Sequence, residues 1–205
     1  MQPQSKLSAV NACLMAASEA PVSTLDGNAG LNVQQAVAVI DEVSRRLQQD
    51  GWSFNTFTVD LVRDVNNKIP VPADYVSIDW TDPAYTSDKD ITVRGGYLWD
   101  VNENTDVWDG NVTVKVIRLL DWDDLPIHAR DYIQAKSIRM YTDRTVGNAT
   151  LGQFTRQDEQ ETWARFRRTE LQLGDYKVLD SETYRRIVLR RICWRDKLTT
   201  STPTR

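Results

Sequence analysis

Apolar residues recur at helical spacing along the first fifty residues of the chain. Spacings of three and four predict a helix from about Ser5 to Ala17, which ends before Pro21. A second helix is predicted from about Leu31 to Gln49, and Gly51 is placed to end it in a left-handed conformation. The two apolar stripes consist of Leu7, Val10, Leu14 and Ala17, and of Val33, Ala36, Val37, Ile40, Val43 and Leu47. We expect these two helices to pack against each other in antiparallel fashion.

From Trp52 onward, short runs of aromatic and β-branched residues, separated by Asp, Asn and Pro, predict β-strands. The expected strands are Trp52–Val59, Tyr75–Trp80, Ile91–Arg94, Tyr97–Val101 and Val112–Leu119. Gly95 and Gly96 lie between the third and fourth strands, where they supply the positive φ that a two-residue hairpin demands. Together these strands predict a small antiparallel sheet.

Helical spacing returns after the last strand. Pro126 suits the first turn of a helix that we expect to run to about Thr145, and a final long helix is expected from about Leu151 to Leu173. The apolar anchors predicted for the final helix are Leu151, Phe154, Trp163, Phe166 and Leu173. Beyond it, residues 181–205 mix apolar and basic residues in blocks of two or three, which fits neither a regular helix nor a regular strand.

This order of elements predicts an α+β fold: an antiparallel helical bundle with an inserted small antiparallel β-sheet domain and an extended basic C-terminal segment. We expect residues 1–51 and 123–175 to form the helical bundle domain. Residues 52–122 would form the β-rich insertion domain, and residues 176–205 a C-terminal docking segment. A chain of 205 residues with 40% hydrophobic content can bury a core in such an arrangement.

Charge is distributed unevenly around the net value of −4. Residues 51–126 contain 14 acidic and 6 basic residues, for a net charge of −8, whereas residues 181–205 carry a net charge of +5. The middle of the chain is therefore expected to repel anions, and the C-terminal segment to seek an acidic partner. No run approaches the roughly 20 apolar residues of a membrane helix, and the first residues lack the order of a secretory signal, so we expect a cytoplasmic protein.

Few residues are suited to catalysis or to metal binding. Cys13 and Cys193 are expected to be reduced and structural, and His128 is the single histidine, so we predict no catalytic residue, no metal site and no cofactor. His128 itself is expected to be a surface or partly packed side chain. The tryptophans of the β-region could be core residues or contacts to neighbouring subunits, and the core is the favoured interpretation for each. These tryptophans are Trp52, Trp80, Trp99, Trp108 and Trp122.

Asp121, Asp123 and Asp124 form the densest carboxylate cluster. Such a cluster could bind a hard cation or share acid and base functions, but so short a loop lacks the spaced ligands of a calcium site. We interpret the three residues as capping groups for the helix that follows Pro126.

Five strings of residues resemble one protein family. The strings are LSAVNACLMAASEAPVSTLDG, SRRLQQDGWSFNT, ITVRGGYLWD, VIRLLDWDDLP and RQDEQETWARF. In this order they resemble the tail tubular protein A family of T7-like podoviruses, which are tail adaptors, or head-to-tail connectors. The resemblance covers most of residues 7–170, and residues 174–205 match more loosely.

The resemblance implies a structural protein of the virion tail, assembled in the cytoplasm of a bacterial host. Members of the family form a dodecameric ring beneath the portal protein, continue the channel for double-stranded DNA, and receive the tail nozzle, tail tubular protein B. In T7-like phages they also help to hold the tail fibres. The resemblance brings no catalytic residues, and DNA would pass through the lumen without specific binding.

The basic C-terminal segment is interpreted as a portal-docking element, because apolar residues interleave with its arginines. The docking candidates are Tyr184, Arg185, Arg186, Ile187, Val188, Arg190, Arg191, Trp194 and Arg195. Arginines could equally bind nucleic acid, although the acidic remainder of the chain argues against that function. A further alternative is a virion-associated glycan hydrolase that uses Asp or Glu carboxylates.

Overall fold

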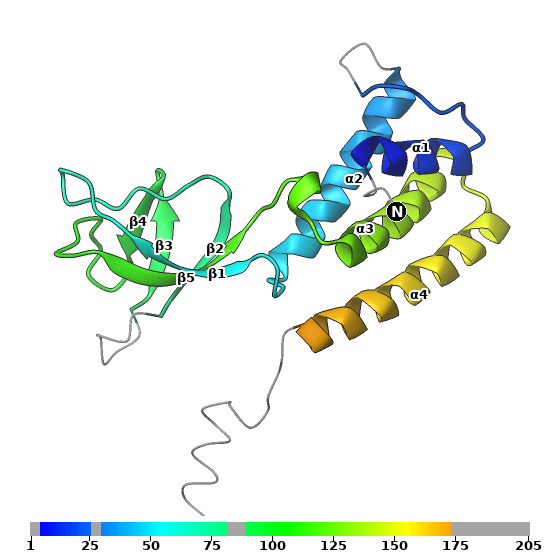
Figure 1. Cartoon of the computed structure of the whole chain (residues 1–205). Helices are drawn as coiled ribbons and strands as arrows, with labels where there is room; N and C mark the ends of the chain where they lie inside the picture. Colours follow the sequence, from blue (N-terminus) through cyan, green and yellow to red (C-terminus); the bar gives the residue numbers. More distant parts are fainter. Residues whose placement is uncertain (1–4, 26–29, 82–88, 174–205) are drawn as a thin grey trace, which may run out of the picture. The chain divides into compact units, whose positions relative to one another are not determined.

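The computed structural model describes residues 5–25, 30–81 and 89–173, which contain four α-helices and five β-strands (Figure 1). The chain forms two compact units, Met1–Arg167 and Arg168–Arg205, and the second is described only for the end of the last helix. Helices and antiparallel strands occur together in the first unit, which confirms the α+β prediction. None of the described helices is long and apolar enough to cross a membrane.

Helices α1 (Lys6–Ala16) and α2 (Leu31–Gln49) form where the apolar stripes predict them. Ser5 caps α1, because its side chain accepts a hydrogen bond from the N–H of Ser8 at 3.1 Å. Lys6 forms an ion pair with Asp41 at 2.7 Å, which joins the start of α1 to the second half of α2, the order expected of antiparallel neighbours.

Gly51 follows α2 with φ +73°, as predicted from its position. A Cβ at this residue would lie 2.6 Å from Cδ1 of Ile117 on the last strand. Glycine is therefore required here for two reasons, the left-handed backbone and the close approach of a strand.

Three strands form one antiparallel sheet in the order β1-β5-β2, with bounds Thr56–Leu61, Val112–Arg118 and Tyr75–Trp80. Strands β3 (Ile91–Arg94) and β4 (Tyr97–Asp100) pair as a separate hairpin, so the five predicted strands divide between two sheets. Side chains alternate along β5, where Val112, Val114 and Val116 are buried and Lys115 is exposed.

The prediction that the first strand begins at Trp52 is wrong, because β1 begins at Thr56. Trp52 and Asn55 close a turn instead: the N–H of Trp52 donates to Oδ1 of Asn55 at 2.8 Å, and the N–H of Asn55 donates to the carbonyl of Trp52 at 3.2 Å. Asn is a poor strand residue and a good turn residue, which is the physical reason for the shift.

The hairpin between β3 and β4 has the predicted turn, with Gly95 at φ +59° and Gly96 at φ +81°. No atom lies within 4 Å of a Cβ built at either glycine, so a substitution there meets only backbone strain. We expect the double substitution to Val to lower the free energy of unfolding by about 2–6 kcal/mol, since each left-handed residue costs about 1–3 kcal/mol. Thermal unfolding measures this loss, and Gly110→Val is the control, because Gly110 also has open space but no positive φ. An unchanged melting temperature in the double variant would contradict the turn assignment.

Helix α3 (Ile127–Thr145) follows a short 3-10 turn, Trp122–Asp124, and α4 spans Ala149–Leu173. Of the anchors predicted for α4, Phe166 is fully buried and Trp163 is partly buried. Phe154 and Leu173 are 66% and 62% exposed, so the prediction that they are anchors is wrong. The side chain of Leu151, the remaining predicted anchor, lies outside the described part of the structure.

Two hydrophobic clusters fill the described part of the first unit. The first gathers side chains of α1, α2, α3 and α4, and it also includes Trp122 and Leu125. The second lies among the strands, and its buried members are Leu61, Ile69, Leu98, Trp108, Val112, Val114 and Val116.

Candidate assembly surfaces

The predicted docking residues, which lie between Tyr184 and Arg195, are outside the described residues. Cys193 is also outside them. Cys13 is free and fully buried on α1, and burial raises the pKa of its thiol to about 12. A thiol with so high a pKa is not a nucleophile at neutral pH, which fits the structural role expected for Cys13.

The interpretation of Asp121, Asp123 and Asp124 as capping groups is wrong. Pro126 is the N-cap of α3, and no side-chain capping hydrogen bond is made there. Asp121 is the N-cap of the 3-10 turn, and its side chain makes no capping hydrogen bond either. The 3-10 turn is stabilised by a residue that follows it in sequence: the buried Arg130 donates hydrogen bonds to the carbonyl oxygens of Leu125 and Asp123. A buried arginine one turn into α3 thus replaces the carboxylates that the sequence led us to expect. Within the described residues, no group of three or more His, Cys, Asp or Glu side chains could hold a metal ion.

An aromatic cluster, which we define as Trp52, His128, Tyr132, Trp163 and Phe166, joins α4 to the rest of the first unit. Phe166 lies at its centre, with ring centroids 4.7 Å from Trp52, 5.5 Å from His128 and 5.8 Å from Tyr132. The indole N–H of Trp52 donates to the carbonyl of Leu47 at 2.7 Å, which satisfies its polar atom inside the cluster. His128 is thus a partly packed histidine, as expected.

The other tryptophans of the middle region divide between the two clusters. Trp122 is buried with the helices, whereas Trp108 is buried among the strands and stacks on Trp80 at 6.0 Å. Trp99 is half-buried, and the Arg94 guanidinium lies 5.0 Å from its ring centroid. The core is therefore the correct interpretation for Trp108 and Trp122.

A buried polar junction, which we define as Gln48 and Asn55, connects the end of α2 to the strands. Gln48 is 2% exposed; its amide donates to the carbonyl of Leu120 at 3.1 Å and its oxygen accepts the N–H of Leu120 at 2.7 Å. Asn55 is fully buried, and its amide donates to the carbonyls of Gln48 and Arg118. Sequence reasoning missed this junction, although an Asn inside a predicted strand was a usable signal.

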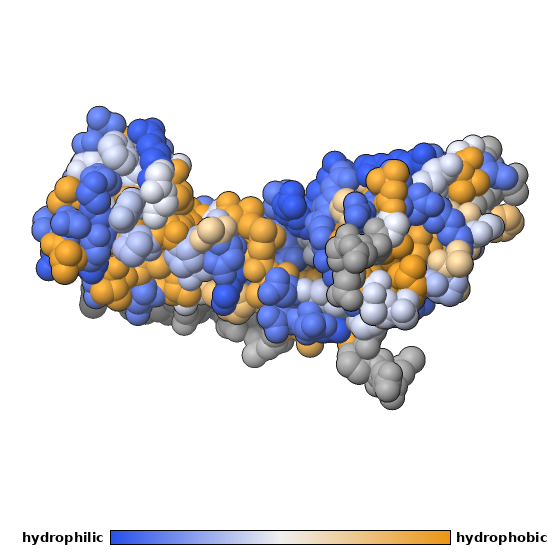
Figure 2. Space-filling model, turned by 90° about the horizontal axis from the view of Figure 1, so that it is seen from above, coloured by the Kyte–Doolittle hydropathy of each residue, from blue (hydrophilic) through white to orange (hydrophobic). Residues whose placement is uncertain are grey.

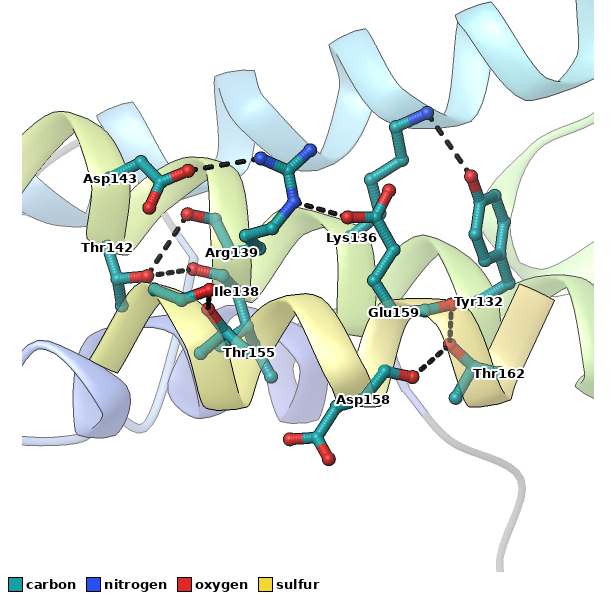
Figure 3. A network of polar contacts seen from close by, with 11 residues as sticks. Tyr132, Lys136, Ile138, Arg139, Thr142, Asp143, Thr155, Asp158, Glu159 and Thr162 are labelled. Carbon is teal, nitrogen blue, oxygen red and sulfur yellow. Dashed lines mark hydrogen bonds and ion pairs between the residues drawn. The ribbon is translucent and has the colours of Figure 1, made fainter. Parts of the chain in front are cut away.

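Besides the aromatic cluster, polar side chains join α3 to α4, which run alongside each other (Figures 1 and 3). Arg139 of α3 pairs with Glu159 of α4 and, at 3.0 Å, with Asp143 of its own helix. The hydrogen bond to Glu159 is the main cause that raises the pKa of Arg139. Two open surface grooves of about 320 and 390 Å³ flank this contact, the first lined by Gln134 and Thr155 among others, the second by Arg156 and Trp163 among others.

Asp100 organises the turn after β4. Its carboxylate is 2% exposed, accepts the N–H groups of Asn102 and Glu103, and pairs with Lys89 at 2.9 Å. Burial by itself raises the pKa of Asp100, but the bonds from Glu103 and Lys89 outweigh it, so the pKa lies below the usual 3.8. These bonds also explain why β4 ends at Asp100 rather than at Val101.

We expect this carboxylate to make stability depend on acidic pH. Because the pKa of Asp100 is lower in the folded than in the unfolded state, its stabilisation is complete above the unfolded value and is lost as pH falls through the folded value. Asp100→Asn should lower the free energy of unfolding at neutral pH by about 1–3 kcal/mol and should flatten its decline below about pH 4. Urea unfolding over a pH series measures both effects, with the exposed Asp109→Asn as control. Parallel pH curves for wild type and Asp100→Asn would contradict this role.

Exposed apolar side chains are available for contacts with other proteins. On the face seen in Figure 2, hydrophobic residues are interspersed with hydrophilic ones. The most exposed among the described residues are Leu31, Val62, Val65, Ile127, Phe154 and Leu173, with Val65 at 98%. Single exposed residues of this kind are ordinary, so they permit contacts without identifying a partner.

Comparison with known proteins gives one consistent result. The family described as "Tube: Tail tubular protein" matches residues 7–176, which is most of the chain. The chain is also 30% identical over 134 residues to tail tubular protein A of Klebsiella phage KP34, a match that covers 62% of this chain. The matched region is 66% of that relative, just under two thirds of its length. Since the family match covers more than half of the sequence, the chain belongs to the tail tubular protein family and is a structural protein of a phage tail.

Proposed function

We propose that this protein is a tail adaptor: a dodecameric ring that joins the portal to the tail nozzle and continues the DNA channel. The observation that carries the proposal is the family match over residues 7–176, which includes both the helices and the strands. A closed ring needs two different contact surfaces on each subunit, because its interfaces are heterologous. In the same proposal, tail fibres attach to the assembled ring.

We assign a different set of contacts to each of the domains expected from the sequence. The helical bundle of residues 1–51 and 123–175 makes the contacts that close the ring, and the β-rich insertion of residues 52–122 contacts other tail components. The polar junction supports this division, because it fixes where the chain leaves and re-enters the helices. The excess of acidic residues in positions 51–126 would repel DNA wherever it lines the channel, so that the genome slides without binding.

Residues 176–205 dock on the portal in this proposal. Their net positive charge and interleaved apolar residues suit an acidic, partly apolar surface. Replacing Arg190 and Arg191 with Gln should weaken portal binding and reduce its sensitivity to added salt, because surface charge attraction is screened. Replacing Arg45 and Arg46, which are also adjacent in sequence and are exposed on α2, is the matched control. Equal portal affinity for both pairs across a salt series would remove the docking role from this segment.

The ring itself is tested on the purified protein, alone and with portal. Native mass measurement and electron microscopy should show closed particles of twelve subunits. Only monomers at high concentration, with and without portal, would overturn the proposal.

Three described carboxylates do not fit the general acid that the glycan hydrolase alternative requires. The pKa values of Glu42, Asp64 and Asp100 lie below their usual values, mainly through hydrogen bonds that outweigh burial, whereas a general acid needs a raised pKa. Incubation with host surface polysaccharide tests this alternative directly. New reducing ends that disappear in a folded Asp123→Asn variant would favour the hydrolase.

A further inference from the structure

The helices and the strands bury their side chains in two separate clusters, and none of the described residues belongs to both. The chain crosses from α2 to β1 between Gln49 and Thr56, and it returns from β5 to the 3-10 turn between Arg118 and Trp122 (Figure 1). Parts of a chain with separate cores ordinarily move relative to each other unless a large apolar interface joins them. The contacts at the two crossings therefore decide how firmly the strands are held to the helices.

The first crossing is bonded to the last turn of α2. A helix leaves the carbonyls of its last turn without partners inside the helix. Here the indole N–H of Trp52 donates to the carbonyl of Leu47 at 2.7 Å, and the amide of Asn55 donates to the carbonyl of Gln48 at 2.8 Å. Because the N–H of Trp52 also donates to Oδ1 of Asn55, the two residues are tied to each other as well as to the helix.

The second crossing is bonded to the same helix end and to the sheet. The N–H of Arg118 donates to the carbonyl of Asn55 at 2.9 Å. The N–H of Leu119 donates to a backbone carbonyl just before β2 at 2.8 Å, and the N–H of Leu120 donates to the side chain of Gln48 at 2.7 Å. Three successive residues thus have three different partners, so a backbone rotation in this crossing would break at least one hydrogen bond.

Both side chains of the polar junction are buried, and each of their polar atoms has a partner. Besides its two bonds to Leu120, Gln48 donates to Oγ of Ser44 at 3.0 Å. Asn55 donates two hydrogen bonds through its amide and accepts one through its side-chain oxygen. A buried polar network in which every member is satisfied rigidifies its surroundings, because a bond that opens in the interior has no water to replace it.

Close packing accompanies these hydrogen bonds. Ile117 of β5 lies against Gly51 at the end of α2, where a Cβ would come within 2.6 Å of its Cδ1. The ring centroid of Trp52 lies 4.7 Å from that of Phe166, so the first crossing is also packed against α4. The crossings therefore leave little space for the sheet to turn relative to the helix.

We propose that the polar junction is a rigid coupling, which holds the sheet β1-β5-β2 in one orientation relative to α2 so that the two move as one body. Without the junction, each hydrophobic cluster would stay folded but the sheet would turn relative to the helix. This inference goes beyond the proposed function, because it concerns the single subunit. In an assembly, the coupling would keep surfaces on the sheet at a fixed angle to surfaces on α2.

Distances between two spin labels measure the coupling in the full chain. Labels on Asn32→Cys and Lys115→Cys report α2 against β5, and labels on Asn32→Cys and Arg45→Cys, both on α2, give the distance distribution of a single rigid element. All three positions are exposed. The labelled chains carry Cys193→Ser, while Cys13 stays because it is fully buried.

The wild-type junction should give a single peak between α2 and β5 that is about as wide as the peak within α2. Gln48→Met removes the bonds to Leu120 and should widen the first peak by about twofold or more in protein that still unfolds cooperatively. Gln49→Met, at an exposed position, is the matched control and should leave the width unchanged. A wild-type peak clearly wider than the peak within α2, or a folded Gln48→Met variant with the wild-type width, would overturn the coupling.

Hydrogen exchange of the unsubstituted chain tests the coupling without a label or a variant. The N–H of Leu120 should exchange as slowly as those of Val114 and Val116 in β5, because a rigid junction opens only when the sheet itself opens. Exchange at Leu120 that is faster by about a hundredfold or more would show that the junction opens on its own, which would overturn the coupling. Both experiments use the single subunit, so their outcome is independent of whether rings form.

Discussion

Replacing Phe166 with alanine is expected to lower the free energy of unfolding by about 3–5 kcal/mol, the range for removing a large aromatic side chain from a core. Phe166 is fully buried, and its ring contacts Trp52, His128 and Tyr132. The variant should therefore leave a cavity where α4 meets the rest of the first unit. Denaturant unfolding followed by tryptophan fluorescence measures the loss, because Trp52 and Trp163 both lie against Phe166.

Phe154→Ala is the matched control for this prediction. Both phenylalanines lie on α4, but Phe154 is 66% exposed, so its removal should change the free energy of unfolding by no more than about 0.5 kcal/mol. Equal losses for the two variants would mean that burial on α4 is not distributed as described. If ring formation suffers from Phe154→Ala while stability does not, the exposed ring takes part in assembly.

Gln48→Met should destabilise the protein by about 2–4 kcal/mol while keeping a side chain of similar shape. The substitution leaves both the N–H and the carbonyl of Leu120 without their partner, and a buried unsatisfied group costs about 1–3 kcal/mol. Because this junction connects α2 to the chain that leaves β5, ring assembly should also weaken under conditions where the variant is still folded.

Gln49→Met is the control, since the neighbouring Gln49 is exposed and should tolerate the change. Thermal and urea unfolding of the two variants give the comparison. A Gln48→Met variant as stable as Gln49→Met would show that the buried hydrogen bonds of the junction contribute little.

Much of the local structure is predictable from the sequence. Helix α2 and strands β2 and β3 have the expected bounds, because their apolar residues repeat at the period of the element that they form. Gly51, Gly95 and Gly96 have the positive φ that their positions imply, because few other residues tolerate that backbone. These features depend on neighbours within a few residues in the chain.

The errors concern side chains whose surroundings come from distant parts of the chain. Phe154 and Phe166 belong to the same helix, yet only Phe166 reaches Trp52, more than a hundred positions earlier in the sequence. The three carboxylates before α3 looked like capping groups, but the turn is stabilised by Arg130 through backbone carbonyls.

The order and type of the elements, the turn glycines and membership of the family can be predicted from the sequence, because each of these follows from local spacing or from strings of residues. The tertiary structure alone decided the division of the strands into two sheets, the polar junction of Gln48 and Asn55, and the aromatic cluster around Phe166. The physical reason is that burial and hydrogen bonding depend on which partner lies across the gap. For Gln48 that partner is Leu120, whose backbone forms two of its hydrogen bonds and which no periodicity near Gln48 could have indicated.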